Sequence, residues 1–205
     1  IGILTAGGDT PALNATIQGA VTRANQLKVE IIGLIKGFNS LFNPRVPHVH
    51  LNPLYHEIPE LDPTKGGTLI GSSRDFVDPD DHEKLDQIVD RLRRLKIDGL
   101  ICVGGDGTLN GLQPLADRLP TVLAPKTIDN DLDLPHGIPT FGFQTARHVG
   151  VEIVKNLMVD ARTTTRWYLI VTMGRKAGHL ALGIGKAAGA TLTIIPEEFQ
   201  ERPVR

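Results

Sequence analysis

The sequence has 205 residues, of which 40% are hydrophobic, and a formal net charge of -1. This length predicts one domain or two small ones, at about 100 to 200 residues per domain. The near-neutral charge gives no support to a nucleic-acid partner, which would call for an excess of Lys and Arg. The single cysteine, Cys102, excludes a disulfide framework and a cysteine metal cluster, and its apolar neighbours predict a buried structural thiol.

No apolar run is long enough to span a membrane, and no basic-then-apolar leader opens the sequence. We therefore expect a soluble, cytoplasmic protein. The sequence starts at Ile1 without a methionine, inside a predicted strand, and stops at Arg205 soon after another one. Both ends look cut, so we expect the chain to be part of a longer protein.

The first half of the chain predicts strands that alternate with helices. Residues 1–5 are typical of a short buried strand, and a turn containing Gly7 and Gly8 leads into a helix with apolar residues at helical spacing up to position 27. Residues 29–35 predict a second strand, whereas residues 43–65, rich in proline and polar residues, predict a loop with little regular structure.

Two further features precede the middle of the chain. His48 and His50 would share one face of a strand, but without a third ligand at suitable spacing the pattern does not favour a metal site. A glycine-rich turn over residues 66–74 ends in Arg74. Asp80 and Asp81 then offer an N-cap for a helix with an apolar stripe from position 85 to 95.

The second half repeats the alternation. Strands are predicted at 100–103, 121–124, 167–171 and 191–195, and helices at 145–160, with Val149, Ile153 and Leu157 on one side, and at 178–188. The pattern predicts an α/β protein with a parallel sheet. We expect a Rossmann-like three-layer domain over residues 1–139 and the start of a smaller α/β domain over residues 140–205.

Glycine turns and aspartates follow several of these strands. Gly105 and Gly107 flank Asp106 after one strand, and Asp129 and Asp131 follow the next. Loops at the carboxyl ends of parallel strands form the ligand crevice, so these carboxylates could converge on one substrate. Glycines let backbone amides approach a polyphosphate closely.

Other phosphate-binding motifs are absent from the sequence. It contains no P-loop motif, and Gly183 and Gly185 fall within a predicted helix, so we interpret them, with Gly189, as sites of close helix packing. Phosphoryl transfer needs a metal, cations and a base. Asp106, beside the glycines, suits Mg²⁺, which needs only one or two protein carboxylates, and Asp129 is the better candidate base.

Several motifs together resemble the phosphofructokinase A family, the ATP- or pyrophosphate-dependent 6-phosphofructokinases. They are the turn at residues 7–11, the turn at 66–74, Gly-Gly-Asp-Gly-Thr at 104–108, Pro-Lys-Thr-Ile-Asp-Asn-Asp at 125–131, and Met-Gly-Arg at 173–175, with Pro-Glu at 196–197. The resemblance implies that Asp129 deprotonates the 1-hydroxyl of fructose 6-phosphate, that Asp106 holds Mg²⁺, and that Thr127 contacts the reacting centre with Asp131 in support.

The resemblance also implies the remaining ligands. The donor would contact Gly7, Gly8, Arg74, Gly105, Gly107, Thr108 and Lys126. The sugar phosphate would be held by Met173, Gly174 and Arg175, and Arg175 would also take part in catalysis. Arg166 matches an arginine that reaches a neighbouring subunit's site, which implies a homo-oligomer, a dimer or tetramer, with shared active sites. In the family a C-terminal portion supplies further ligands, so a protein ending at Arg205 should be inactive.

The identity of the phosphoryl donor is the open question. In the family an aspartate after Gly-Gly-Asp accompanies pyrophosphate, because its side chain fills and charges the space of the ATP α-phosphate; here that residue is Gly107. Lys126 is a marker of pyrophosphate enzymes but is compatible with either donor. The sequence therefore favours ATP, with pyrophosphate as the alternative.

Two other classes of protein share part of the pattern. NAD and lipid kinases also use Gly-Gly-Asp-Gly-Thr, but the motifs at 125–131 and 173–175 argue against them. A non-catalytic subunit that binds nucleotides or sugar phosphates would have no need to keep Asp106, Asp129, Arg74 and Arg175 together.

Overall fold

The computed structural model describes residues 1–10, 12–75 and 77–199. Two compact units make up the chain, Ile1–Lys126 and Thr127–Arg205, and each has a hydrophobic core of its own. The units divide at 126/127, and the domain boundary that we expect at 139/140 for the complete protein stays a prediction.

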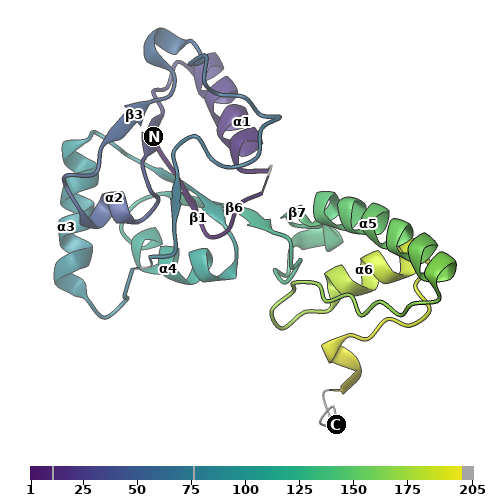
Figure 1. The fold of residues 1–205 in the computed structure, drawn as a ribbon. Coiled ribbons are helices and arrows are strands. Elements are labelled where there is room, and N and C mark those ends of the chain that lie inside the picture. Colours follow the sequence, from purple (N-terminus) through teal and green to yellow (C-terminus); the bar gives the residue numbers. More distant parts are fainter. Residues whose placement is uncertain (11, 76, 200–205) are drawn as a thin grey trace. The chain divides into compact units, whose positions relative to one another are not determined.

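A mostly parallel sheet forms the centre of the first unit (Figure 1). Within this unit the strand order is β3-β2-β1-β5-β6, with β4 beside the end of β1, and β7 belongs to the second unit. β1 pairs in parallel with β2, β4 and β5, and β5 with β6, whereas β2 and β3 are antiparallel. This confirms the α/β prediction. The strands are β1 (Gly2–Ala6), β2 (Ile32–Leu34), β3 (His48–His50), β4 (Ser72–Ser73), β5 (Leu100–Gly104), β6 (Thr121–Thr127) and β7 (Phe141–Gly142).

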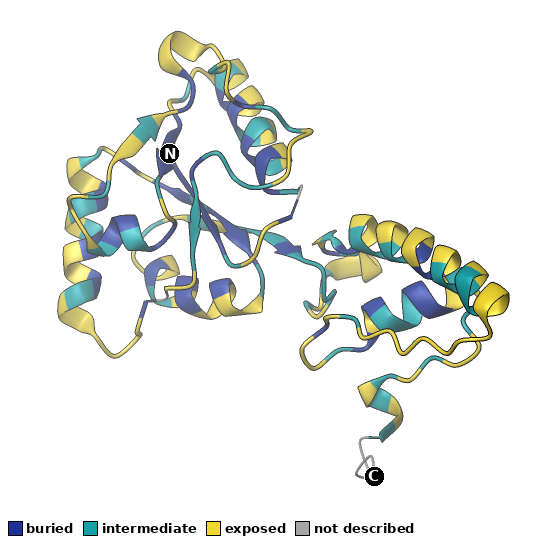
Figure 2. Ribbon diagram, in the orientation of Figure 1, coloured by how far each residue is buried: buried dark blue, intermediate teal, exposed yellow. Residues whose placement is uncertain are grey.

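Alternating side chains of the central strands fill two cores, one on each face of this sheet. Ile3 and Val103 pack with α1 (Ala12–Leu27), whereas Leu4 and Cys102 pack on the opposite face. That opposite core also takes residues from α2 (Asn39–Phe42), α3 (His82–Arg94) and α4 (Asp106–Ala116). The unit is therefore three-layered, and Figure 2 shows its buried centre. Burial raises the pKa of the Cys102 thiol, as suits a structural cysteine.

The start of α3 confirms the predicted cap. The Asp81 carboxylate accepts a hydrogen bond from the backbone N–H of Lys84, which satisfies one of the unpaired donors of the first turn. Leu85, Ile88 and Leu92 form the buried stripe of the helix. The charged residues between them face solvent or its border, as an amphipathic surface helix requires.

The segment 43–65 holds more structure than its composition predicts. It contains β3 and a 3₁₀ turn, η1 (Pro53–Tyr55), and Leu51 and Asn52 are buried. The side chain of Asn52 supplies hydrogen bonds that a neighbouring strand would otherwise make. Its Oδ1 accepts from Ile31 N, and its Nδ2 donates to Val29 O and Asn25 Oδ1. The composition did not indicate this structure, because the hydrogen bonds that stabilise it come from one buried amide side chain rather than from a longer strand.

We expect Asn52→Ala to lower the free energy of unfolding by about 2 kcal/mol, because buried main-chain groups lose their partners. Urea denaturation of the two proteins measures the difference. Asn43→Ala is the matched control, since Asn43 Oδ1 accepts its hydrogen bond from Arg45 N in an exposed turn. This substitution should cost less than about 0.5 kcal/mol. Equal losses in both variants would contradict a special role for Asn52.

The second unit is built on a pair of helices, α5 (Phe143–Thr164) and α6 (His179–Ala188), with the 3₁₀ turns η2 (Pro135–Gly137) and η3 (Pro196–Phe199). Glycines allow the close packing: a Cβ on Gly150 would lie 2.3 Å from Ile184 Cδ1, and one on Gly185 2.1 Å from Thr193 Oγ1. Gly183 is also close to the neighbouring helix, since a Cβ on it would lie 2.8 Å from Arg147 Cδ, as the predicted helix packing requires. Gly189 differs, because it ends α6 at a φ of 76° with no atom near its Cβ position.

The apolar stripe expected on α5 lies away from the core of this unit. Val154 is buried with Leu180 and Ile184, and Val151 is also buried, whereas Val149 and Ile153 are 51% and 53% exposed. Both stripes have helical spacing, so periodicity alone did not distinguish them. Within the described part of the chain, no helix combines the length and the apolar character that a membrane span requires.

The strands predicted at 167–171 and 191–195 are wrong for the chain as described. Neither segment pairs with a strand among the described residues, and Trp167 and Leu169 are 96% and 94% exposed. A strand is stable only when a neighbour satisfies its main-chain N–H and C=O groups. The apolar pattern of both segments is typical of a strand, but a local pattern does not reveal whether another strand lies beside it.

Candidate active site

The glycine turn after β1 is held from several sides. Gly7 has a φ of 81°, which only glycine adopts easily. Its N–H donates to Ser73 O, and Ser72 Oγ donates to its carbonyl. Lys126 Nζ donates to Gly8 O at 2.6 Å. Lys126 is 4% exposed, so this ammonium at the end of β6 is buried against the turn.

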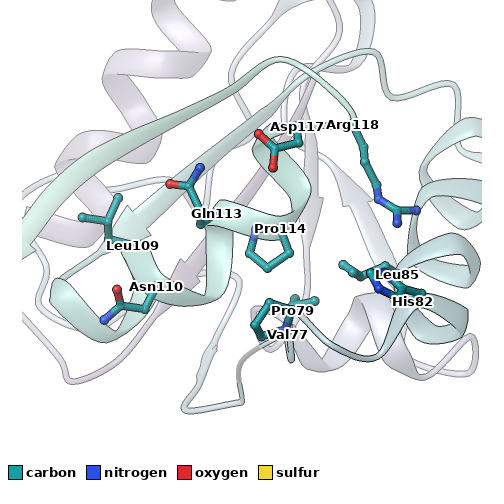
Figure 3. Close-up of a pocket in the computed structure, with 10 residues that line it drawn as sticks. All are labelled: Val77, Pro79, His82, Leu85, Leu109, Asn110, Gln113, Pro114, Asp117 and Arg118. Carbon is teal, nitrogen blue, oxygen red and sulfur yellow. The ribbon is translucent and has the colours of Figure 1, made fainter.

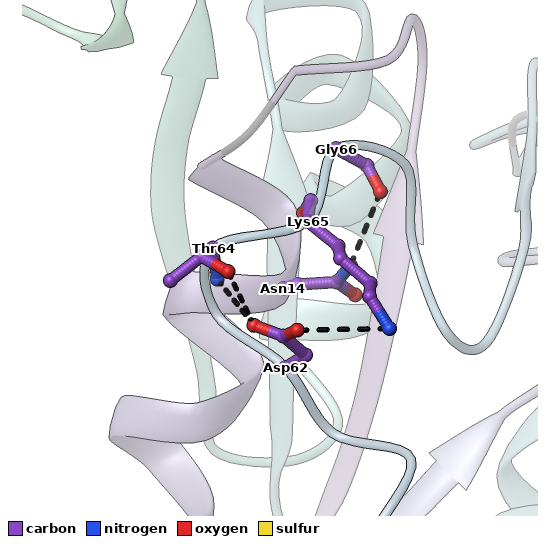
Figure 4. Close-up of polar contacts among 5 residues, drawn as sticks. All are labelled: Asn14, Asp62, Thr64, Lys65 and Gly66. Carbon is purple, nitrogen blue, oxygen red and sulfur yellow. Dashed lines mark hydrogen bonds and ion pairs between the residues drawn. The ribbon is translucent and has the colours of Figure 1, made fainter.

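The second glycine turn, at residues 66–74, docks onto the first. Gly67 N donates to the Asp9 carboxylate at 2.6 Å, and Thr5 Oγ1 donates to Gly71 O. Asn14 of α1 donates to Lys65 O and Gly66 O, as Figure 4 shows. β4 then aligns the segment beside β1, and the exposed Arg74 follows it directly.

Asp62 fixes the approach to this second turn. Its carboxylate accepts from the hydroxyl and the N–H of Thr64 and pairs with Lys65 at 3.6 Å (Figure 4). The Thr64 hydroxyl, followed by the Thr64 N–H, holds the pKa of Asp62 below its ordinary value. A carboxyl group with a lowered pKa favours the folded state above its unfolded pKa, and that contribution is lost as pH falls through the folded pKa.

The third turn joins β5 to α4 and carries Asp106. A Cβ on Gly104 would lie 2.1 Å from Thr108 Oγ1, so glycine is needed there for Thr108 to close the first turn of the helix. Thr108 is itself buried, so its side chain packs at the helix start in addition to its predicted contact with the phosphoryl donor. Asp106 and Gly107 are exposed at the helix start, and a Cβ on Gly107 would meet no atom within 4 Å.

A cavity of about 760 Å³ runs along the same helix (Figure 3). Leu109, Asn110 and Gln113 of α4 line one part of it, and Val77 and Pro79 of the loop before α3 line another. Arg118 and Asp86 form an ion pair, and Arg118 is among the cavity's lining residues. The cavity thus begins two to three residues beyond Asp106 and Gly107.

The last residue of β6 and the loop that follows it, residues 127–131, belong to the second unit. Ile128 packs against that unit's core, whereas Asp129, next to it, is half-buried, and its N–H donates to Thr127 Oγ1 at 3.1 Å. Asn130 has a φ of 55°. The exposed Asp131 follows. The loop therefore has an apolar anchor between the residues expected to do chemistry.

Two residues that the sequence did not indicate hold this loop. Thr140, 2% exposed, donates from its hydroxyl to Thr127 O at 2.7 Å and from its N–H to Asn130 Oδ1 at 2.9 Å. His179, the first residue of α6, has its Nδ1 2.8 Å from Asn130 O. His179 lies 49 residues from its partner, so no local pattern connects them.

Glu197 caps the start of α6. Its Oε1 accepts from Gly178 N at 2.7 Å. This hydrogen bond, its own backbone N–H and the positive character of His179 hold the pKa of Glu197 below its ordinary value. The cap is therefore present above the unfolded pKa of this carboxyl and is lost as pH falls through the folded pKa.

The turn at residues 173–175 has a demanding backbone. Gly174 has a φ of 155°, and a Cβ on it would lie 2.3 Å from Ala177 O. Arg175 has a φ of 52° and is exposed, and Met173 is 74% exposed. Arg166, also exposed, follows the end of α5. Met173, Arg175 and Arg166 are thus accessible, whereas Gly174 is buried.

The structure brings some of the predicted residues together. Gly7 and Gly8 meet Lys126 in the first unit, and Thr127 meets Asp129 in the second. The expected convergence of Asp106 with Asp129 and Asp131 involves both units and stays a prediction. Among the described residues no group of three metal-binding side chains occurs. A single exposed carboxylate such as Asp106 still fits Mg²⁺, which keeps several waters and takes its other ligands from phosphates.

Comparisons with known proteins agree on one family. The family model described as Phosphofructokinase matches residues 1–202. A pyrophosphate--fructose 6-phosphate 1-phosphotransferase of Thermotoga maritima is 45% identical over 98% of the chain and 48% of its own length. An ATP-dependent 6-phosphofructokinase of Brevibacillus brevis is 37% identical over 98% of the chain and 61% of its own length.

A solved structure supports the fold. The crystal structure of Pichia pastoris phosphofructokinase in the T-state matches all of the chain with a TM-score of 0.81, at 23% identity over 21% of that protein. The chain spans about half to three-fifths of the length of the two curated relatives. The family model covers nearly the whole sequence and carries the assignment: this chain belongs to the phosphofructokinase family.

Proposed function

We propose that this chain binds the phosphoryl donor and bears the base of a 6-phosphofructokinase, with ATP as the favoured donor. The 1-hydroxyl oxygen of fructose 6-phosphate attacks the γ-phosphorus of ATP. A new O–P bond forms, the bond from that phosphorus to the ADP oxygen breaks, and Asp129 takes the hydroxyl proton. The products are fructose 1,6-bisphosphate and ADP.

One observation carries the proposal: the loop of Thr127 and Asp129 is fixed by a buried threonine. Thr140 holds Thr127 O and the Asn130 side chain, and Asp129 donates its own N–H to Thr127 Oγ1. A general base must be held within hydrogen-bond reach of the proton that it removes. A loop held at both its ends meets this requirement, and Asp129 keeps an accessible part of its surface.

The charged groups divide by role. When bound, Mg²⁺ would be held by Asp106 and would neutralise charge on the donor phosphates. Arg74 and the N–H groups of the Gly7, Gly8 and Gly105 turns would bind the donor, and the start of α4 adds a field that favours anions. Arg175, with Met173 and Gly174, would bind the sugar phosphate.

Arg166 would complete the sugar-phosphate site of a neighbouring subunit. The proposal therefore includes a homo-oligomer with shared active sites. The side chain of Arg166 is exposed in the single chain, as this role requires.

The choice of ATP rests on Gly107 and the cavity beside it. Among the described residues outside its own turn of helix, no atom lies within 4 Å of the Gly107 Cβ position, so the helix start has room for an α-phosphate. The cavity of about 760 Å³ along α4 is of a size that binds small organic ligands, and Val77, Pro79 and Leu109 give it apolar walls. A nucleoside requires such a cavity, whereas pyrophosphate does not.

Pyrophosphate is the second candidate donor. The observation in its favour is the 45% identity to a protein named as a pyrophosphate--fructose 6-phosphate 1-phosphotransferase. The buried Lys126 beside Gly8 is compatible with both donors. The proposal for ATP therefore depends on Gly107 rather than on overall similarity.

A coupled assay of the full-length protein with fructose 6-phosphate and Mg²⁺ tests the proposal. We expect turnover with ATP, and kcat/KM for ATP above that for pyrophosphate. Turnover with pyrophosphate alone would replace the favoured donor with the second candidate. The absence of turnover with either donor would contradict the proposed reaction.

A further inference from the structure

His179 contacts the loop that bears Asp129. Its Nδ1 lies 2.8 Å from the carbonyl oxygen of Asn130, the residue that follows Asp129. A carbonyl oxygen only accepts hydrogen bonds, so Nδ1 carries the proton in this contact. We propose that His179 is a positioning residue that fixes the peptide group between Asn130 and Asp131, one residue beyond Asp129, and so orients the Asp129 carboxylate; this inference rests on the proposed function.

The conformation of Asn130 explains why such a contact is needed. Its φ of 55° lies in the left-handed region, which is unfavourable for a residue other than glycine, although Asn tolerates it better than most. Thr140 holds the Asn130 side chain and the carbonyl of Thr127. His179 supplies the hydrogen bond to the main chain on the other side of Asp129, so the base lies between two fixed peptide groups.

His179 is itself held by its neighbours. The N–H of Gly178 is bound by Glu197, and Leu180 is 4% exposed in the core of the unit. A Cβ on Gly178 would lie 2.4 Å from Ile195 Cβ, so this backbone has little room to shift. The imidazole is therefore carried by a rigid helix start, which is what a positioning group requires.

The exposure of His179 separates this role from general stability. The residue is exposed and adds little to the core, so replacing it should cost little folding free energy. The bond to Asn130 O should then act locally, on the geometry of the loop. A misplacement of about 1 Å in an active site can lower the rate by about 10²-fold.

A set of three variants in the full-length protein tests the proposal. His179→Leu removes the donor, His179→Asn keeps an N–H near the position of Nδ1, and His179→Gln moves the N–H to the position of Nε2. We expect kcat to fall about 10-fold or more in the Leu and Gln variants and less than about 3-fold in the Asn variant. The fall should be the same with ATP and pyrophosphate, with KM for either donor unchanged, since the contact is on the base.

Two further measurements distinguish positioning from a merely structural role. In an Asp129→Asn background, His179→Leu should lower kcat little further, because a residue that acts through Asp129 is not additive with its loss. Hydrogen exchange of the peptide covering 127–131 should be faster in the Leu variant than in the Asn variant, with equal melting temperatures.

Each outcome decides the proposal. Equal kcat in the Leu and Asn variants, additive losses, or unchanged exchange of 127–131 would overturn it. An active wild-type protein with these results would leave the proposed function in place while removing His179 from it. If the wild-type protein were inactive with both donors, the proposed function would fail, and the exchange measurement would still decide whether His179 fixes the loop.

Discussion

Replacing Asp129 by Asn in the full-length protein is expected to lower kcat by at least about 10²-fold, with little change in KM for fructose 6-phosphate. The amide keeps the size and the polarity of the side chain but cannot accept the proton of the sugar hydroxyl. The backbone contact of Asp129 with Thr127 Oγ1 uses the main-chain N–H, which the substitution keeps. Steady-state kinetics with both donors measures the effect.

A neighbouring aspartate provides the control for this experiment. Asp133 is exposed, lies on the same connection and has no assigned role, so Asp133→Asn should leave kcat within about 2-fold of wild type. Near-normal turnover of the Asp129 variant, or an equal loss in both variants, would remove Asp129 as the base.

The local features of the fold were predictable from the sequence. β1, β5 and β6 are apolar runs that end in glycine or proline, and Asp81 caps α3 through its own side chain, so each signal and its structural consequence lie within a few residues. The segments at 167–171 and 191–195 carry the same kind of signal but no neighbour to pair with among the described residues. Strand formation depends on a second segment, which a local pattern does not contain.

In the candidate site, too, the local features were predictable from the sequence, whereas the contacts between distant residues were not. The types of residue at 104–108 and 125–131 indicated phosphoryl transfer, and Gly104 is needed where Thr108 closes the helix start. The contacts that hold the loop of Asp129 come from Thr140 and His179, which are separated from it along the chain. The sequence therefore predicts which groups would do the chemistry, but it did not indicate the groups that hold their loop.

Lys126 illustrates how the structure changes the interpretation of a residue. The resemblance implied a donor ligand, and the structure buries this lysine against the turn of Gly7 and Gly8. An ammonium that fixes the turn at Gly7 and Gly8, where the proposal places the donor, would serve ATP and pyrophosphate alike. The identity of the donor then depends on the space at the start of α4, and on Gly107 in particular.

Replacing Gly107 by Asp is expected to lower kcat/KM for ATP by about 10²-fold and kcat/KM for pyrophosphate by less than about 10-fold. The new carboxylate would enter the open space at the start of α4, where the proposal places the α-phosphate of ATP. Two like charges about 4 Å apart repel by about 4 kcal/mol at an effective dielectric constant of 20, enough for a 10²-fold loss. Pyrophosphate has no α-phosphate and avoids this repulsion.

The position tolerates the change, which makes the result interpretable. Gly107 has no left-handed φ and no neighbour within 4 Å of its Cβ position, and an acidic residue in the first turn of a helix is favourable. The Asp variant should therefore unfold at the temperature of the wild-type protein. Gly107→Asn is the matched control, because it fills the same space without the charge.

Comparison of the two variants separates volume from charge. If space alone excludes ATP, Asn and Asp should lower kcat/KM for ATP equally; if charge contributes, Asp should lower it further. In either case kcat/KM for pyrophosphate should change less than that for ATP. An equal loss with both donors would show that the start of α4 does not discriminate between them, and the choice of ATP would then lose its structural basis.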